Sequence, residues 1–254
     1  MNGLLEGLWP EQAALTAAAA LAAGVLNAIA GGGSFLTFPA LVFAGVPPVA
    51  ANATSAMAVS PGYLGSTLGF RPELRSLPAS LLRREVGVAA LGGLLGAGLL
   101  LVTPAKVFAG IVPWLLLLAT ALFALGPRIA GLSGGTGHPG WRLPGLLAVA
   151  VYGGYFNGGL GILLMALYTL SGESRLNTVN ALKNLNSFVL SLLSVVAFAT
   201  AGAIVWPQAV WMMLWATAGG WAGARLARRL PTRWVRLLVI VTGLVMSVVF
   251  FVRS

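Results

Sequence analysis

Long apolar stretches alternate with short polar connections along the whole chain. The apolar stretches cover 13–45, 50–70, 86–102, 107–126, 144–171, 178–201, 207–224 and 235–252. A helix needs about 20 residues to cross the hydrocarbon core of a bilayer, so most of these stretches predict one spanning helix each. The pattern therefore predicts an all-α polytopic membrane protein.

Two of the stretches contain residues that disfavour a continuous helix. The first is interrupted by "GGGS" at 31–34, and the fifth is interrupted by "NGGLG" at 157–161. Each Gly costs a helix about 1 kcal/mol relative to Ala, and lipid tolerates unwound backbone only where protein or a cavity covers it. We therefore expect each interrupted stretch to form a broken-helix hairpin, which either re-enters or crosses the membrane twice.

Four short motifs recur in the same order in the two halves of the chain. They pair "GVLNAIAG" (24–31) with "GYFNGGLG" (154–161), "ANA" (51–53) with "VNA" (179–181), "GGLLG" (92–96) with "GGWAG" (219–223), and "TPAKVF" (103–108) with "LPTRWV" (230–235). This order predicts two membrane repeats, 1–126 and 144–254, joined by the polar loop 127–143. Each repeat is expected to hold one hairpin followed by three transmembrane helices.

The basic residues support the hairpin interpretation. If every stretch crosses once, they divide evenly between the two sides of the membrane. If the first and fifth stretches are hairpins, one side holds Arg71, Arg75, Arg83, Arg84, Arg128, Arg142, Arg175, Arg225, Arg228, Arg229, Arg233 and Arg236, and the other holds Lys106 and Arg253. Only the second arrangement obeys the positive-inside rule. It also gives the two halves opposite orientation, as in inverted-repeat transporters, and places both termini outside the cytoplasm.

Composition excludes several classes of chemistry. The chain is 58% hydrophobic and 8% charged, contains no Cys, and has one His, His138, in a Gly/Pro-rich loop. These counts predict no metal, no cofactor and no enzymatic nucleophile–base pair. The net charge of +10 is spread over short loops, which argues against nucleic-acid binding. The acids are five Glu residues, all outside the apolar stretches. We therefore expect no carboxylate inside the membrane, and transport driven by the anion gradient and membrane potential or by a proton on the substrate.

The first break predicts an anion site. Ser34 is expected to cap the helix that follows it, and Gly31, Gly32 and Gly33 would let a ligand approach the backbone. The first turn of a helix also presents free N–H groups and the positive end of its dipole. The alternative for the glycines is close helix packing.

The second half contributes a polar helical face. Asn180, Lys183, Asn184 and Ser187 fall on one side of a helix at 100° per residue. Asn52, Thr54 and Ser55 are their counterparts in the first half, and we expect the two stripes to face each other. The alternative for Lys183 is snorkelling toward the nearby helix end.

Two further Gly pairs predict tight helix packing. They are Gly92 with Gly96 and Gly219 with Gly223, each separated by three residues. Outward Gly stripes would also allow a homodimer, which nothing in the sequence requires.

The run "LNAIAGGGSFLTFPALVFAGVPPVAANATS", with "NALKN" in the second half, resembles the sulfite-exporter family of the TauE/SafE type over nearly the whole chain. The resemblance implies a carrier of sulfite, organosulfonates or related sulfur-containing anions in a bacterial inner membrane. It implies substrate-binding roles for Asn27, Gly31, Gly32, Gly33, Ser34, Asn52, Thr54, Ser55, Asn157, Gly161, Asn180 and Lys183, to which the polar face adds Asn184. The second half lacks the full glycine run, so its half-site would rely on Lys183.

The sequence therefore predicts a carrier in the lipid bilayer that binds a small anion at two helix breaks near the midplane. An anion channel, a carrier of another small carboxylate or oxyanion, and a structural membrane subunit remain as alternatives. Saturation and counterflow would separate a carrier from a channel, and the costly intramembrane Asn and Lys residues argue against a purely structural role.

Overall fold

The computed structural model describes residues 10–29, 32–132, 139–226 and 232–253, and these ranges contain helices and no strand. The α-helices are α1 (Pro10–Ile29), α2 (Ser34–Phe43), α3 (Pro48–Gly69), α4 (Arg71–Arg75), α5 (Ala79–Val102), α6 (Ala105–Leu132), α7 (Arg142–Tyr155), α8 (Leu160–Leu170), α9 (Leu176–Thr200), α10 (Trp206–Leu226) and α11 (Thr232–Arg253), with a short 3-10 helix, η2, at Pro139–Trp141. The expected all-α class is confirmed.

Both predicted helix breaks are present. The first apolar stretch divides into α1 and α2, and the fifth divides into α7 and α8. Three helices are long and apolar enough to cross a membrane on their own, namely α5, α9 and the Ala105–Leu122 part of α6. The helices of the two broken stretches include apolar segments that are shorter, Ser34–Phe43 and Leu160–Leu170 among them.

The connection between the halves is shorter than the predicted loop at 127–143. Helix α6 continues to Leu132, and η2 already begins at Pro139. Hydropathy marks where a helix leaves apolar surroundings, whereas its hydrogen-bond ladder continues beyond that point.

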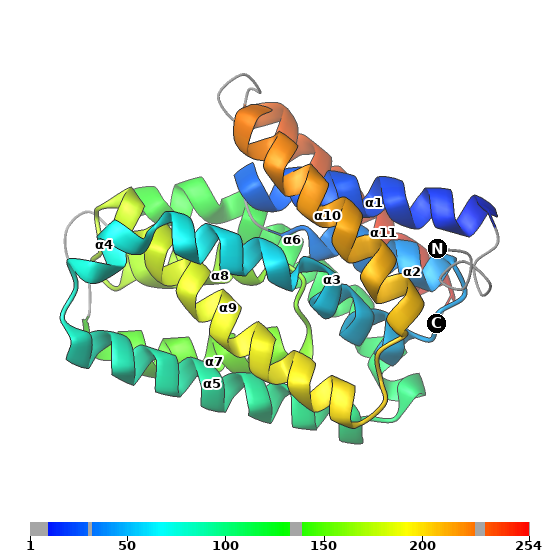
Figure 1. Ribbon diagram of the computed structural model, residues 1–254, viewed down its shortest axis with the longest axis horizontal. Helices are drawn as coiled ribbons and strands as arrows, with labels where there is room; N and C mark the ends of the chain where they lie inside the picture. The colour runs from blue at the N-terminus through cyan, green and yellow to red at the C-terminus, as the bar shows by residue number, and fades with distance from the viewer. Residues whose placement is uncertain (1–9, 30–31, 133–138, 227–231, 254) are drawn as a thin grey trace.

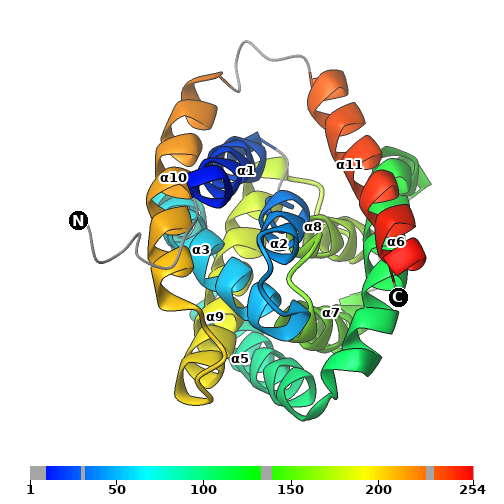
Figure 2. The same ribbon diagram turned by 90° about the vertical axis from the view of Figure 1, so that its right-hand side faces the viewer.

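Each broken stretch packs against a long helix from the other half of the chain. Helix α1 lies along α10, and α7 lies along α5 (Figures 1 and 2). The Gly pairs allow these contacts: a Cβ at Gly96 would collide with the Val151 carbonyl oxygen of α7, and one at Gly219 would collide with the Leu21 carbonyl oxygen of α1. The predicted packing role of these glycines is confirmed. Such close backbone approach matters because helix association in lipid depends on van der Waals contact.

The core is centred on the short helices. Phe38 of α2 packs edge-on against Phe156 at 5.4 Å and stacks on Phe250 of α11 at 5.6 Å. A second apolar cluster includes Leu146, Leu160, Leu182 and Leu190, from α7, α8 and α9. The first turns of α2 and α8, which follow the two breaks, are thus buried in the protein, as broken helices in lipid require.

Candidate functional site

The first break has the backbone of a tight turn. Gly32 has φ +94°, a left-handed conformation that only Gly adopts readily. A Cβ at Gly33 would lie 2.6 Å from the Ala23 carbonyl oxygen of α1, so no side chain fits there. Gly31, the third glycine of the predicted site, lies outside the described residues.

Asn27 caps the second half of this broken stretch. Its Oδ1 accepts a hydrogen bond of 2.7 Å from the Gly33 N–H. The prediction that Ser34 is the N-cap is wrong, because α2 begins at Ser34 and the cap position falls one residue earlier, on Gly33. The Ser34 hydroxyl is instead buried, with the residue 3% exposed, and has no hydrogen-bond partner among the described residues.

The second break is held by two tyrosines. Gly159 turns the chain with φ +75° before α8 begins. Tyr152 donates a hydrogen bond of 2.7 Å to the Gly158 carbonyl oxygen. Tyr63 of α3 donates one of 3.4 Å to Asn157 Oδ1. Neither tyrosine was expected at the site, because nothing in the sequence near them indicates which backbone they reach.

The two breaks touch each other. A Cβ at Gly32 would lie 3.5 Å from Ile162 Cδ1, and one at Gly159 would lie 3.3 Å from the Phe35 ring. Gly161 is a predicted site residue in the first turn of α8. Its neighbour in the chain, Ile162, contacts the first break. No described residue accepts a hydrogen bond from the N–H of Ser34 or of Gly161. The contact thus brings two helix N-termini and one unpaired hydroxyl into the same region.

The predicted polar residues of α3 are engaged with protein. Asn52 Nδ2 donates to the Tyr155 carbonyl oxygen at the end of α7, at 3.0 Å. Thr54 Oγ1 accepts from the Val205 N–H just before α10, at 3.0 Å. Ser55 Oγ lies 2.7 Å from Thr37 Oγ1 of α2. These bonds connect α3 to three neighbouring segments and fix the backbone around both breaks.

The polar face of α9 is buried. Lys183 is 8% exposed and Asn184 is 6% exposed, while Asn180 is half-buried. None of the described residues accepts a hydrogen bond from Lys183 or forms an ion pair with it. Most of the Lys183 side chain is therefore covered by protein, and both interpretations, a functional residue and snorkelling toward the helix end, stay open.

The two polar stripes do not face each other as expected. Helices α3 and α9 run in opposite directions (Figure 1) and meet where Ser60 Oγ lies 3.0 Å from Ser191 Oγ. Asn52 precedes Ser60 by eight residues and Lys183 precedes Ser191 by eight, which is about 12 Å along each helix. Because the helices are antiparallel, these displacements separate Asn52 from Lys183.

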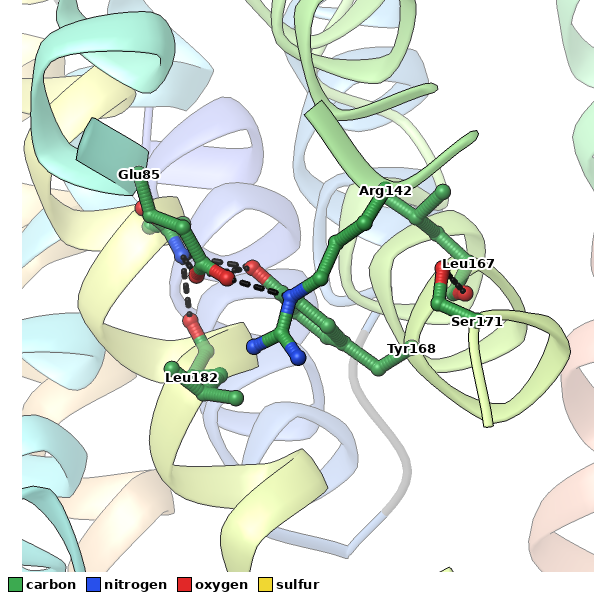
Figure 3. A network of polar contacts seen from close by, with 7 residues as sticks. Glu85, Arg142, Leu167, Tyr168, Ser171 and Leu182 are labelled. Carbon is green, nitrogen blue, oxygen red and sulfur yellow. Dashed lines mark hydrogen bonds and ion pairs between the residues drawn. The ribbon is translucent and has the colours of Figure 1, made fainter. Parts of the chain in front are cut away.

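A polar network missed by the sequence interpretation surrounds Glu85 (Figure 3). This residue of α5 is 0% exposed. Its carboxylate accepts from Arg142 Nε at 2.6 Å, from the Tyr168 hydroxyl at 2.9 Å and from Asn186 Nδ2 at 2.8 Å. The network joins α5, α7, α8 and α9 around a single ion pair.

The sequence placed Glu85 outside the apolar stretches and did not predict that its carboxylate is buried inside the protein. Glu85 is the seventh residue of α5, a helix long and apolar enough to span a membrane. The sequence places it beside Arg83 and Arg84, which made it look like part of a polar connection. Its partners are distant in sequence, so only the fold reveals the burial. Among the described residues, no group of three His, Asp or Glu side chains could hold a metal ion.

Comparisons with known proteins all find similarity to membrane transporters. The family model "Sulfite exporter TauE/SafE" matches residues 16–250. The chain is 26% identical to "Probable membrane transporter protein ORF9" of Sinorhizobium sp, over 91% of this chain and 88% of the relative. It is 28% identical to "Probable membrane transporter protein YfcA" of Escherichia coli K12, over 90% and 85%. It is 29% identical to a "Probable membrane transporter protein" of Haemophilus influenzae, over 89% of each. No solved structure matches the chain significantly.

Replacing Asn27 by Ala should release the Gly33 amide. Loss of one hydrogen bond of about 1 kcal/mol predicts roughly fivefold faster hydrogen exchange in the peptide that contains Gly33. Mass spectrometry of the protein in detergent measures this rate. Asn177→Ala, at an exposed position on α9, is the matched control. Unchanged exchange at Gly33 in the Asn27 variant would show that Asn27 does not hold the break.

Proposed function

The chain belongs to the sulfite exporter TauE/SafE family of membrane transporters, and from this premise we propose that it carries a small anion across the membrane by alternating access. The substrate class is sulfite, an organosulfonate or a related sulfur-containing anion. Its chemistry as an oxyanion, with several acceptor oxygens, matches the donors gathered at the two breaks.

The observation that carries the proposal is the contact between the breaks. Ser34 supplies a buried hydroxyl without a partner, and the N–H groups of Ser34 and Gly161 have no acceptor among the described residues. Helix N-termini bind oxyanions through such N–H groups and through the positive end of the helix dipole. Broken-helix transporters place their substrates at ends of this kind.

Lys183 is proposed to neutralise the anion during its passage. A Lys on a mostly covered helix face favours a counter-charge, and none is in contact with Lys183 among the described residues. Asn180 and Asn184 lie within one turn of Lys183 on α9, and their amides would donate to the same oxyanion. The substrate thus supplies the charge that the protein lacks at this helix.

The remaining predicted residues are proposed to shape the site. Asn27, Asn52 and Asn157 hold the chain on either side of the breaks, and Thr54 and Ser55 tie α3 to its neighbours. These side chains would bind the anion only in a conformation in which their present hydrogen bonds to protein are broken. The predicted site residues therefore include some that would bind the anion and others that hold those residues in position.

We also propose that residues 1–126 and 144–254 are inverted repeats. The packing of α1 on α10 and of α7 on α5 is reciprocal between the halves, and the recurring Gly pairs serve both contacts. Movement of one broken stretch and its partner helix relative to the other would open the breaks to alternate sides.

The proposed orientation follows from the basic residues. Helix α4 and the first turns of α5, α7 and α9 lie at one end of the molecule (Figure 1), and they carry Arg71, Arg75, Arg83, Arg84 and Arg142. The positive-inside rule assigns this end to the cytoplasm of a bacterial inner membrane and both termini to the other side.

Cysteine labelling tests this orientation. The chain contains no Cys, so Ser76→Cys and Ala105→Cys each introduce one thiol at an exposed position near opposite ends of the molecule. In intact cells a membrane-impermeant maleimide should label the variant at 105 and leave the one at 76 unlabelled until the membrane is broken. The reverse pattern would contradict the orientation.

Transport assays test the site. Uptake of labelled sulfite and a panel of sulfonates into proteoliposomes should saturate and show counterflow. Lys183→Ala should raise KM or lower uptake by about 10- to 100-fold, the effect of a lost charge-assisted hydrogen bond, and Ser34→Ala by a smaller factor. Lys106→Ala, which removes an exposed charge, should transport normally.

Different failures point to different errors. Normal transport by the Lys183 variant would remove Lys183 from the site. Flux without saturation or counterflow would indicate a channel. Failure of the folded protein to move any sulfur-containing anion would contradict the proposed substrate class.

A further inference from the structure

The ion pair of Glu85 and Arg142 leaves most of the guanidinium free. Among the described residues Arg142 has one hydrogen-bonded partner, Glu85, reached through Nε. Its Nη2 is buried and has no hydrogen-bond partner in the part of the chain that the structure describes. Figure 3 shows both terminal nitrogens pointing away from the Glu85 carboxylate. A guanidinium binds an oxyanion bidentately through its terminal N–H groups, so this end of Arg142 can accept a second anion.

The surrounding residues fix the guanidinium in place. Its carbon lies 5.2 Å from the centre of the Tyr168 ring, and the Tyr168 hydroxyl in turn donates to Glu85. Asn186 donates both to Glu85 and to the Tyr168 oxygen. The side chain of Arg142 is 16% exposed. The side chain is therefore mostly covered, and an anion that binds both terminal nitrogens must displace the atoms that cover Nη2.

The network lies between the second break and the end of the molecule where α7 begins. Tyr168 is eight residues into α8, about 12 Å along the helix from its start. Asn186 follows Lys183 by one turn of α9. Because α9 begins at the same end of the molecule as α7, Asn186 of the network lies nearer the second break and Lys183 lies about one turn nearer that end.

We propose that Arg142 is a second anion subsite, at which the transported anion replaces the Glu85 carboxylate while that carboxylate binds one proton from water. The inference rests on the proposed function. In the exchange, the ion pair between Arg142 and Glu85 gives way to an ion pair between Arg142 and the anion, and Glu85 becomes a neutral carboxylic acid. No covalent bond forms other than the O–H of Glu85.

For electrostatic reasons, anion binding at Arg142 and proton binding at Glu85 must occur together. An anion at Arg142 beside an ionised Glu85 would place two negative charges around one buried cation. A protonated Glu85 without the anion would leave a buried guanidinium unpaired, which costs several kcal/mol. Anion and proton binding therefore promote each other reciprocally. Besides Arg142, the groups facing Glu85 from the packed helices are Tyr168 and Asn186, and Lys183 lies one turn away; none of them carries a negative charge.

The proposal predicts proton movement with an anion that carries no proton itself. Methanesulfonate, which is permanently ionised, is placed outside proteoliposomes that contain a trapped pH indicator. Its inward gradient should acidify the lumen in the wild type, and for this monovalent anion the uptake should not depend on membrane potential. Exchange of internal for external methanesulfonate is measured in parallel.

Glu85→Gln separates coupling from structure. The amide preserves the shape of the side chain and removes its charge, so the number of protons moved per methanesulfonate exchanged should fall about tenfold or more. Glu73→Gln, on α4, should leave both signals unchanged. If Glu85→Gln does not fold, the double variant Glu85→Gln/Arg142→Gln removes both charges together. It should fold, lose acidification and raise KM for exchange about tenfold.

Four results would overturn the proposal. Acidification by Glu85→Gln at the wild-type rate would show that Glu85 does not bind the proton. A parallel loss of exchange and acidification in folded variants would show that the network is only a structural brace. Exchange without acidification in the wild type would refute the coupling and leave the proposed function intact, whereas failure of the folded protein to move methanesulfonate and every other sulfur-containing anion of the panel would refute both.

Discussion

The structure depends on how a membrane protein satisfies the backbone of a broken helix. Water is absent from the hydrocarbon region, so each free N–H and C=O group there costs several kcal/mol unless protein provides a partner. Asn27 binds the Gly33 N–H, Asn52 binds the Tyr155 carbonyl and Tyr152 binds the Gly158 carbonyl. Several backbone groups beside the breaks are therefore paired with side chains, and the unpaired donors among the described residues are the binding groups that we propose.

This requirement links packing to function. The breaks are covered because α1 and α7 lie tightly on α10 and α5, and that contact depends on glycines whose Cβ atoms would strike the opposite backbone. The polar bonds cross between the halves as well: Asn52 and Tyr63 of α3 both reach the second break. A movement of either broken stretch must therefore rearrange bonds at the other, which is a physical basis for coupling the two sides of a carrier.

The sequence was informative where the physics is local. Hydropathy located the helices, the glycine runs located both breaks, and the spaced Gly pairs indicated close packing. It failed where a residue's environment is made by distant segments. Glu85 looked like part of a polar connection, because its partners Arg142, Tyr168 and Asn186 lie 57 to 101 residues away. Ser34 was predicted to be the N-cap of α2, but the N-cap is Gly33. Helix propensities do not locate the start of a helix to within one residue. The polar stripes of α3 and α9 were expected to face each other, but the point at which the two helices cross is set by tertiary packing.

The central claim is that the contact between the two breaks binds the anion. Its most direct test is diffraction from crystals grown with 2-bromoethanesulfonate, whose bromine is located by anomalous scattering. The account predicts a bromine peak between the breaks, with the sulfonate oxygens accepting hydrogen bonds from the Ser34 hydroxyl and the Gly161 N–H. A bound molecule found only away from both breaks, with Ser34 and Gly161 still unliganded, would contradict it.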